Sequence, residues 1–283
     1  MECNLIGVIG AGIRGSGIAQ VCAQAGRKVV MLDVADGAVE LGLGSITALL
    51  TRSVKKGRIN EDEKNAAVAR VRGTTLYADL ACCDVVIEPT RENEALKLNI
   101  LKQVEAVLRP SAIIATNTSS ISIAKLAAAS SYPNRLIGMP FFNPVPVLAL
   151  VELIRGLTSS DDSHECTKAL AIAIGSSSIS NKNGPGFAVN RILCAMINES
   201  ITVLQEGLAC AEQIDEGMTL AGAHSLGPLA LADLIGLDTL LSVLQTFFNG
   251  VNDPKYQPAA LLCEMVDAGR LGRKSGQGFY RYA

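Results

Sequence analysis

The sequence LIGVIGAGIRGSGIAQVCAQAGRKVVMLD, residues 5–33, contains the pattern that decides the fold. Its apolar run Leu5–Ile9 is typical of a buried strand, and residues 18–25 have the apolar composition of a packed helix. A G-x-G-x-x-G motif stands between them and consists of Gly10, Gly12 and Gly15. A second apolar run, residues 29–32, ends in Asp33, 18 residues after the last of these glycines. Strand, glycine turn, helix, strand and acid therefore follow one another as in a βαβ unit.

Each part of this unit suits a dinucleotide. Glycines permit a tight turn and let the backbone approach a pyrophosphate, whose charge is stabilised at the N-terminus of the following helix. The Asp33 carboxylate can accept hydrogen bonds from ribose hydroxyls, but it would repel the 2′-phosphate of NADP, and neither Arg nor Lys occurs in residues 34–37. A glycine turn that serves packing alone is the other interpretation. The surrounding pattern favours a site that binds NAD.

A helical hairpin is expected after Asp33. Apolar residues recur at helical spacing from residue 36 to Val54, Gly57 interrupts the pattern, and a second helical segment spans residues 61–71. The hairpin, about residues 36–72, carries three cations at its turn, Lys55, Lys56 and Arg58. These cations form either a solvated tip or a contact to phosphate groups.

Further strands and helices alternate up to residue 174. Strands are expected at residues 84–88, 112–115, 136–139 and 147–154, and helices at residues 92–108 and 161–174. This alternation predicts an α/β fold with a doubly wound, Rossmann-type parallel sheet that helices cover on both faces. Residues 116–120 would lie at the carboxyl edge of the sheet, where ligands of such folds bind. A boundary near residues 180–185 would give a first domain of residues 1–184.

The second domain, residues 185–283, is expected to be all-helical because no strand pattern occurs in it. Its predicted helices span about residues 187–206, 211–221, 227–248 and 257–268. They carry apolar residues on more than one face. This pattern predicts either packing within the chain or contact with another subunit.

The composition is that of an ordinary globular protein, with 49% hydrophobic and 18% charged residues and a net charge of −2. Because there is no block of like charge, neither nucleic acid nor a membrane is an expected partner. The 8 cysteines include no C-x-x-C pair, and no His stands at metal-ligand spacing, so we expect a reduced, metal-free, cytoplasmic protein. We expect neither export nor a membrane span, because the first residues carry no basic run and no uninterrupted apolar run reaches about 18 residues.

A second informative stretch is LIGMPFFNPVPVLALVE, residues 136–152, in which a segment rich in Pro joins two apolar runs. Together with the glycine motif and Asn117-Thr-Ser-Ser120, it resembles the active-site region of the L-3-hydroxyacyl-CoA dehydrogenases, including the 3-hydroxybutyryl-CoA dehydrogenases. The family pattern there is G-M-H-F-F-N-P followed by L-V-E. This chain has Pro140 where the family has its catalytic His. The resemblance continues to residues 272–279 and covers essentially the whole chain.

The resemblance implies NAD-dependent oxidation of a 3-hydroxyacyl-CoA in a homodimer formed through the second domain. Glu152 corresponds to the acid that orients the family's His, and Ser119 and Asn190 would form hydrogen bonds at the substrate oxygen. Lys56 would contact the CoA part of the substrate. The cofactor-binding positions that the resemblance implies are Gly10, Gly12, Gly15, Asp33, Glu92, Lys97, Asn117, Ser119, Asn143 and Lys274.

Pro140 leaves the activity open, because proline cannot accept a proton from a substrate hydroxyl. Of the two histidines, His164 is expected on a surface helix and His224 in a segment between helices. One interpretation is a dehydrogenase, acting on this or a related hydroxyacyl thioester, that is slowed by loss of its base. The others are an NAD- and acyl-CoA-binding pseudoenzyme and a normal dehydrogenase with an engineered or accidental substitution. The structural alternatives are Ser119 as a helix cap, Asn190 in a local turn, and solvated Lys97 and Lys274.

Overall fold

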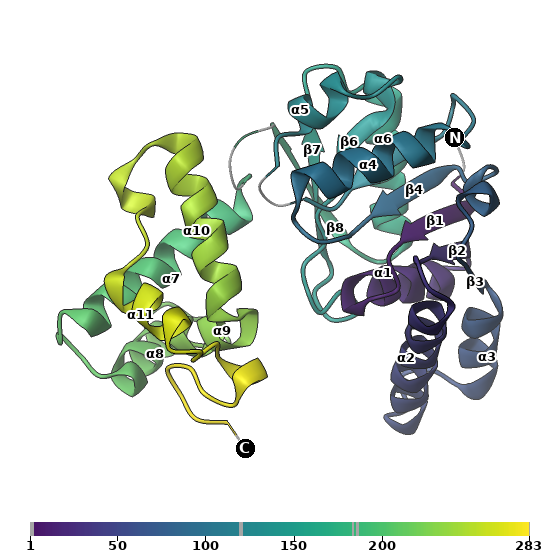
Figure 1. Cartoon of the computed structure of the whole chain (residues 1–283). Helices are drawn as coiled ribbons and strands as arrows, with labels where there is room; N and C mark the ends of the chain where they lie inside the picture. Colours follow the sequence, from purple (N-terminus) through teal and green to yellow (C-terminus); the bar gives the residue numbers. More distant parts are fainter. Residues whose placement is uncertain (1–2, 119–120, 183, 185–186, 283) are drawn as a thin grey trace. The chain divides into compact units, whose positions relative to one another are not determined.

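A computed structural model of the chain describes residues 3–118, 121–182, 184 and 187–282. The chain forms two compact units, Met1–Asn183 and Gly184–Ala283 (Figure 1). The first unit is built on a sheet, and the second is built from helices. The expected fold class, a doubly wound sheet with an inserted helical hairpin and a helical C-terminal part, is confirmed.

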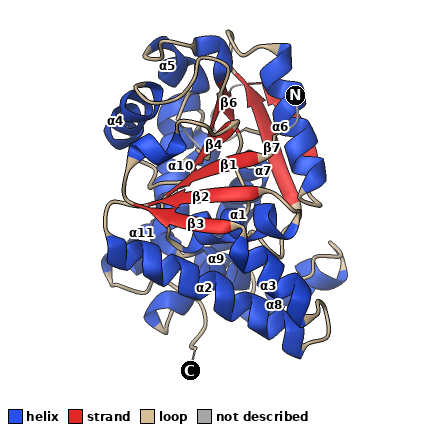
Figure 2. Cartoon of the chain, turned by 90° about the vertical axis from the view of Figure 1, so that its right-hand side faces the viewer, coloured by secondary structure: helices blue, strands red, loops and turns tan. Residues whose placement is uncertain are grey.

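The sheet of the first unit has eight strands in the order β3-β2-β1-β4-β5-β6-β7-β8. Figure 2 shows the strands β1, β2 and β3 side by side. This order places β1 between β2 and β4, the point at which doubly wound sheets bind ligands. The strands are β1 (Leu5–Ile9), β2 (Lys28–Leu32), β3 (Val71–Thr74), β4 (Val85–Glu88), β5 (Ile113–Thr116), β6 (Leu136–Gly138), β7 (Leu150–Arg155) and β8 (Ser177–Lys182).

Three features of the sheet differ from the sequence-based expectation. The strands β3 and β8 were not predicted, and β6 pairs with β7 in antiparallel fashion, so the sheet is not parallel throughout. Both missed strands lie at the edges of the sheet. The sequence of β8, SSISNK, lacks an apolar run because its residues are exposed or only half-buried. Edge strands of this kind give no strong periodic signal.

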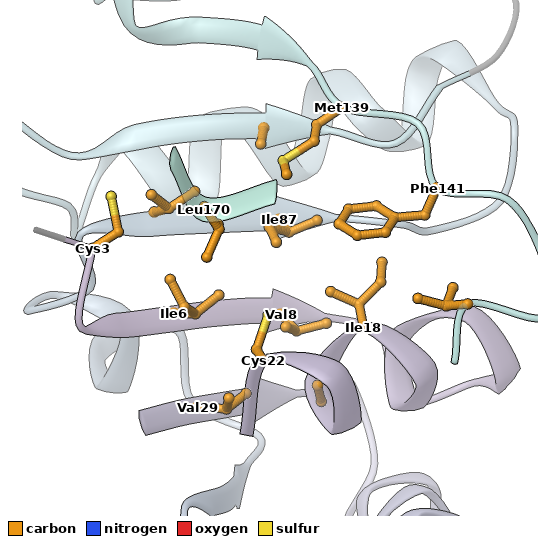
Figure 3. Close-up of a cluster of buried hydrophobic side chains, with 14 of the residues drawn as sticks. Cys3, Ile6, Val8, Ile18, Cys22, Val29, Ile87, Met139, Phe141 and Leu170 are labelled. Atoms are coloured by element: carbon orange, nitrogen blue, oxygen red, sulfur yellow. The ribbon is translucent and has the colours of Figure 1, made fainter. Parts of the chain in front are cut away.

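Helices cover both faces of the sheet. On one face, alternate residues of the strands pack against α1 (Ile13–Gln24) and α6 (Asp161–Ala173), and Figure 3 shows Ile6, Val8, Ile18 and Leu170 within this cluster. The opposite face carries α4 (Glu94–Glu105) and α5 (Ile123–Ala128). There, side chains of α4 and α5 meet those of β1, β5 and β6, namely Ile100, Leu101, Val104, Leu126, Ile9, Ile114 and Leu136.

The predicted hairpin consists of α2 (Asp36–Lys55) and α3 (Glu61–Ala69). Gly57 adopts a φ of +65° after the first helix, a conformation that glycine tolerates. Asn60 begins the second helix with a capping box, in which its side chain accepts from the backbone N–H of Glu63 and the Glu63 side chain accepts from that of Asn60. The local sequence therefore fixes the turn.

The second unit contains five α-helices among its described residues. They are α7 (Val189–Gln205), α8 (Ala211–Leu220), α9 (Pro228–Ile235), α10 (Leu237–Val251) and α11 (Ala260–Asp267). The prediction of one helix over residues 227–248 is wrong, because Gly236 has a φ of +99° and separates α9 from α10, with a bend of 97°. No single helix in the described part of the chain is long and apolar enough to cross a membrane; α9 and α10 meet that test only as a bent pair.

Two further expectations are corrected in the first unit. Cys3 and Cys166 form a disulfide, so the cysteines are not all reduced. These residues are 163 positions apart, and no spacing rule could have paired them. His164 is buried rather than on the surface, and its Nε2 lies 2.8 Å from the Ser180 hydroxyl on β8. The imidazole is buried because it lies against β8, the edge strand that was not predicted.

Candidate active site

The glycine turn follows β1 at the carboxyl edge of the sheet. Gly10 has a φ of +108°, and its N–H donates to the carbonyl of Leu32 on β2. A Cβ atom on Gly15 would lie 1.8 Å from the Gly10 carbonyl oxygen, so no side chain fits there. At Gly12, by contrast, no described atom lies within 4 Å of such a Cβ. The turn is therefore closed on its inner side and open at Gly12.

The open side leads to the N-terminus of α1. Gly12 is the N-cap residue, and among the described residues the first turn of this helix has neither a capping side chain nor an acid. Free N–H groups at the start of a helix attract anions, and the open position at Gly12 lets a pyrophosphate approach them. The residues present therefore fit NAD. The cofactor would be held by Gly10, Gly12 and Gly15 through the backbone and by Asp33 through its carboxylate.

Asp33 also stabilises the glycine turn, a role that the sequence did not reveal. Its Oδ2 accepts from the backbone N–H of Ala11, inside the glycine turn, at 2.7 Å, and its Oδ1 accepts from that of Val34 at 2.7 Å. Each carboxylate oxygen has two lone pairs, so both can still accept from ribose hydroxyls. The phenol of Tyr77 lies in the same area: burial, and then the charges of Glu88 and Asp33, raise the pKa of Tyr77.

We expect Asp33→Ala to weaken NADH binding by about 1.5 to 3 kcal/mol, the range for hydrogen bonds to a charged group. The loss arises because the variant removes the ribose acceptor and also releases the N–H of Ala11. Calorimetric titration with NADH and NADPH is the measurement, with Glu40→Ala on the exposed side of α2 as the control. Equal affinity of the unmodified protein for the two cofactors would refute the role given to the Asp33 charge.

Lys97 was expected to bind the cofactor or to be solvated, and the structure shows it buried in an ion pair. Its Nζ donates to both carboxylate oxygens of Glu88, at 2.9 and 2.8 Å, and to the carbonyl of Thr90 at 3.3 Å. Glu88 ends β4 and also accepts from the Thr116 hydroxyl on β5 at 2.8 Å. The pair therefore ties the start of α4 to two strands. An acid at the end of the apolar run VVIE was the sequence signal for it.

Asn117, Glu92 and Asn143 lie in loops that follow the strands. Asn117 is buried, and its side-chain oxygen accepts from the N–H of Phe141 at 2.8 Å. Glu92 accepts from the Thr118 hydroxyl and from the N–H of Ile121. Asn143 is exposed and precedes Pro144 through a cis peptide bond. Ser119, expected to serve both substrate and cofactor, lies outside the described residues.

Pro140, which follows β6, lies directly opposite Glu152 of β7 in antiparallel register. The N–H of Glu152 donates to the carbonyl of Pro140 at 3.1 Å, and the adjoining pair Phe141 and Val151 has the same antiparallel register. Residues directly opposite each other in such a ladder point to the same face of the sheet. Both are buried, and Glu152 is 0% exposed. A side chain longer than proline at position 140 would therefore extend beside the Glu152 carboxylate.

The other predicted residues belong to the hairpin or to the second unit. Lys56 is the exposed C-cap residue of α2. Asn190 lies in the first turn of α7, half-buried, and Lys274 forms an ion pair with Asp238, both within the second unit. His224 lies between α8 and α9. No group of three His, Cys, Asp or Glu residues in the described part of the chain could hold a metal ion.

Comparison with known proteins agrees with this geometry. The family model described as 3-hydroxyacyl-CoA dehydrogenase, NAD binding domain matches residues 5–184, and the model for the C-terminal domain of that family matches residues 186–282. A 3-hydroxybutyryl-CoA dehydrogenase of Bradyrhizobium diazoefficiens is 47% identical over 98% of this chain and 94% of its own length. A probable 3-hydroxybutyryl-CoA dehydrogenase of Bacillus subtilis is 45% identical over 100% of this chain and 98% of its own length.

Among solved structures, an (S)-3-hydroxybutyryl-CoA dehydrogenase from Ralstonia eutropha is 54% identical and covers 100% of both chains, with a TM-score of 0.96. The glycine turn, the sheet order and the helical second unit thus occur in a chain that matches this family from end to end. The protein is a member of the 3-hydroxyacyl-CoA dehydrogenase family, and its first domain is an NAD-binding domain.

Proposed function

We propose that this protein oxidises (S)-3-hydroxyacyl-CoA thioesters, of the 3-hydroxybutyryl-CoA kind, to 3-ketoacyl-CoA with NAD. The observation that carries the proposal is the intact dinucleotide turn, open at Gly12, in a chain whose two units both match the family. Bound NAD would supply the hydride acceptor. We expect Pro140 to lower the rate, because proline cannot accept the hydroxyl proton.

The remaining polar residues would act on the hydroxyl that is oxidised. Ser119 and Asn190 would form hydrogen bonds to its oxygen, where charge changes during the reaction. Glu152 would provide the negative charge beside position 140. The cofactor would be bound with the help of Glu92, Lys97, Asn117, Asn143 and Lys274. Lys97 would act indirectly, through its ion pair with Glu88. Lys56 on the hairpin would contact the phosphates of CoA.

The test is the reverse reaction, which is readily followed. Purified protein is mixed with acetoacetyl-CoA and NADH, and the loss of NADH absorbance is recorded. We expect a slow, protein-dependent loss that Asp33→Ala reduces further. NADH binding without any turnover would instead support an NAD- and acyl-CoA-binding protein that has lost catalysis.

We propose that the second domain, about residues 185–283, forms a homodimer. Its surface carries large apolar side chains that the chain itself leaves uncovered, and Ile192, Leu208 and Leu220 are 72%, 70% and 77% exposed. Contiguous apolar patches often mark subunit contacts, and we expect these side chains to belong to one. Sedimentation velocity at micromolar concentration should give the mass of two chains, whereas a single-chain mass would contradict the proposal.

We also propose a cytoplasmic location and a role in fatty acid metabolism. The substrate class supports the role, since acyl-CoA thioesters are the activated form of fatty acids. Six of the eight cysteines are free, which fits a reducing compartment, whereas the Cys3–Cys166 disulfide does not. Fractionation of cells that produce the tagged protein would test the location.

A further inference from the structure

Three strands meet around the Glu152 carboxylate. It stands on β7, with Pro140 opposite it on one side, after β6, and with β8 on the other side. In the parallel pairing of β7 with β8, Glu152 lies opposite Ile179 and Ile154 lies opposite Asn181. Side chains two residues apart in a strand share a face, so Asn181 points to the same face as Glu152.

Asn181 contacts the carboxylate directly. Its Nδ2 donates to the Oε1 of Glu152 at 2.6 Å. A hydrogen bond to an ionised acceptor is about twice as strong as one between neutral groups, and burial strengthens it. The amide is neutral and has no proton to exchange near neutral pH. It can therefore orient the carboxylate and favour its charged form, but it cannot transfer a proton.

We propose that Asn181 is a positioning residue, which fixes the Glu152 carboxylate from β8 although the chain has no imidazole at position 140. This inference deepens the proposed dehydrogenase function and rests on it. A histidine introduced at position 140 would meet an acceptor that is already oriented. Asn181 would then share the carboxylate with that imidazole and hold the pair in its ionised form.

The first test is made in the unmodified protein and needs no catalysis. A double-mutant cycle combines Asn181→Leu with Glu152→Gln and measures the unfolding equilibrium in urea at neutral pH. Leucine has nearly the size of asparagine but no donor. We expect the unfolding constant to show a coupling of about five- to tenfold, because the charged acceptor gains more from the amide than a neutral one does. Independent effects of the two changes would overturn the proposal.

The second test uses Pro140→His and records kcat/KM for 3-hydroxybutyryl-CoA against pH. Adding Asn181→Leu should move the midpoint of the rising limb up by about one pH unit, because a lost donor to the anion lets the carboxylate–imidazole pair keep its proton longer. Asn181→Asp should move it further, since it adds a like charge.

Ser180→Ala is the matched control for this second test. Ser180 neighbours Asn181 on β8 but contacts His164 on the opposite face of the sheet, so the midpoint should not change. If Asn181→Leu does not shift the midpoint, Asn181 contributes only to packing. If Pro140→His binds NADH but remains inactive, the dehydrogenase function fails, and the coupling in the unmodified protein still decides the role of Asn181.

Discussion

Pro140→His should raise the rate of 3-hydroxybutyryl-CoA oxidation by about a hundred- to ten-thousand-fold, the usual contribution of a positioned acid–base group. The new imidazole would stand directly across the strand ladder from Glu152, on the same face of the sheet. The carboxylate would hold one ring nitrogen, so that the other could accept the hydroxyl proton. Initial rates with saturating NAD are the measurement, and they should rise through about pH 6 to 7, near the ordinary pKa of His.

Pro140→Ala is the matched control for this prediction. Proline lacks the backbone N–H that the residue opposite Glu152 would donate back across the ladder, and both substitutions restore this donor. Only histidine also supplies a base. Equal rates for the two variants would show that any gain in rate comes from the restored backbone N–H. The double variant Pro140→His, Glu152→Gln should gain much less in rate than Pro140→His alone. No gain at all, in a protein that still binds NADH, would favour a protein without catalysis.

Lys97→Met should destabilise the first domain by about 3 to 5 kcal/mol, the typical effect of removing one partner of a buried ion pair. The side chains of Lys97 and Glu88 are 1% and 5% exposed, so water cannot replace the lost ammonium. Glu88 would keep its bonds to Thr90 and Thr116 while its charge stayed buried. The midpoint of urea unfolding, followed by circular dichroism, measures the effect.

The chain offers a matched control in an exposed ion pair that also involves α4. Glu94 of α4 pairs with Lys125 of α5, and these side chains are 40% and 62% exposed. Lys125→Met should cost at most about 1 kcal/mol, because solvent screens such pairs. The double variant Glu88→Gln, Lys97→Met should regain part of the stability that Lys97→Met loses. If Lys97→Met and Lys125→Met lower the urea midpoint equally, burial of the Glu88–Lys97 pair adds nothing to its contribution to stability.

Much of the first domain could be predicted from local sequence. The strand, glycine and acid pattern of residues 5–33 predicted β1, α1 and β2, because buried strands need apolar runs and a pyrophosphate needs close backbone approach. The hairpin followed from its apolar spacing and from Gly57. The break at Gly236 was missed, because apolar periodicity continues across it while the backbone turns by 97°.

The sequence by itself determined the family, the fold class and NAD as the cofactor, since each is carried by short motifs whose residues lie close together along the chain. That position 140 lacks a catalytic base stays a prediction. Only the tertiary structure showed the Glu88–Lys97 ion pair, the hydrogen bond from the Ala11 N–H to Asp33 and the hydrogen bond from Asn181 to Glu152. These contacts join residues 9, 22 and 29 positions apart, and the last depends on β8, a strand without an apolar run. Partners of this kind are set by how strands and helices align in space, and no local pattern of apolar residues or turn formers encodes that alignment.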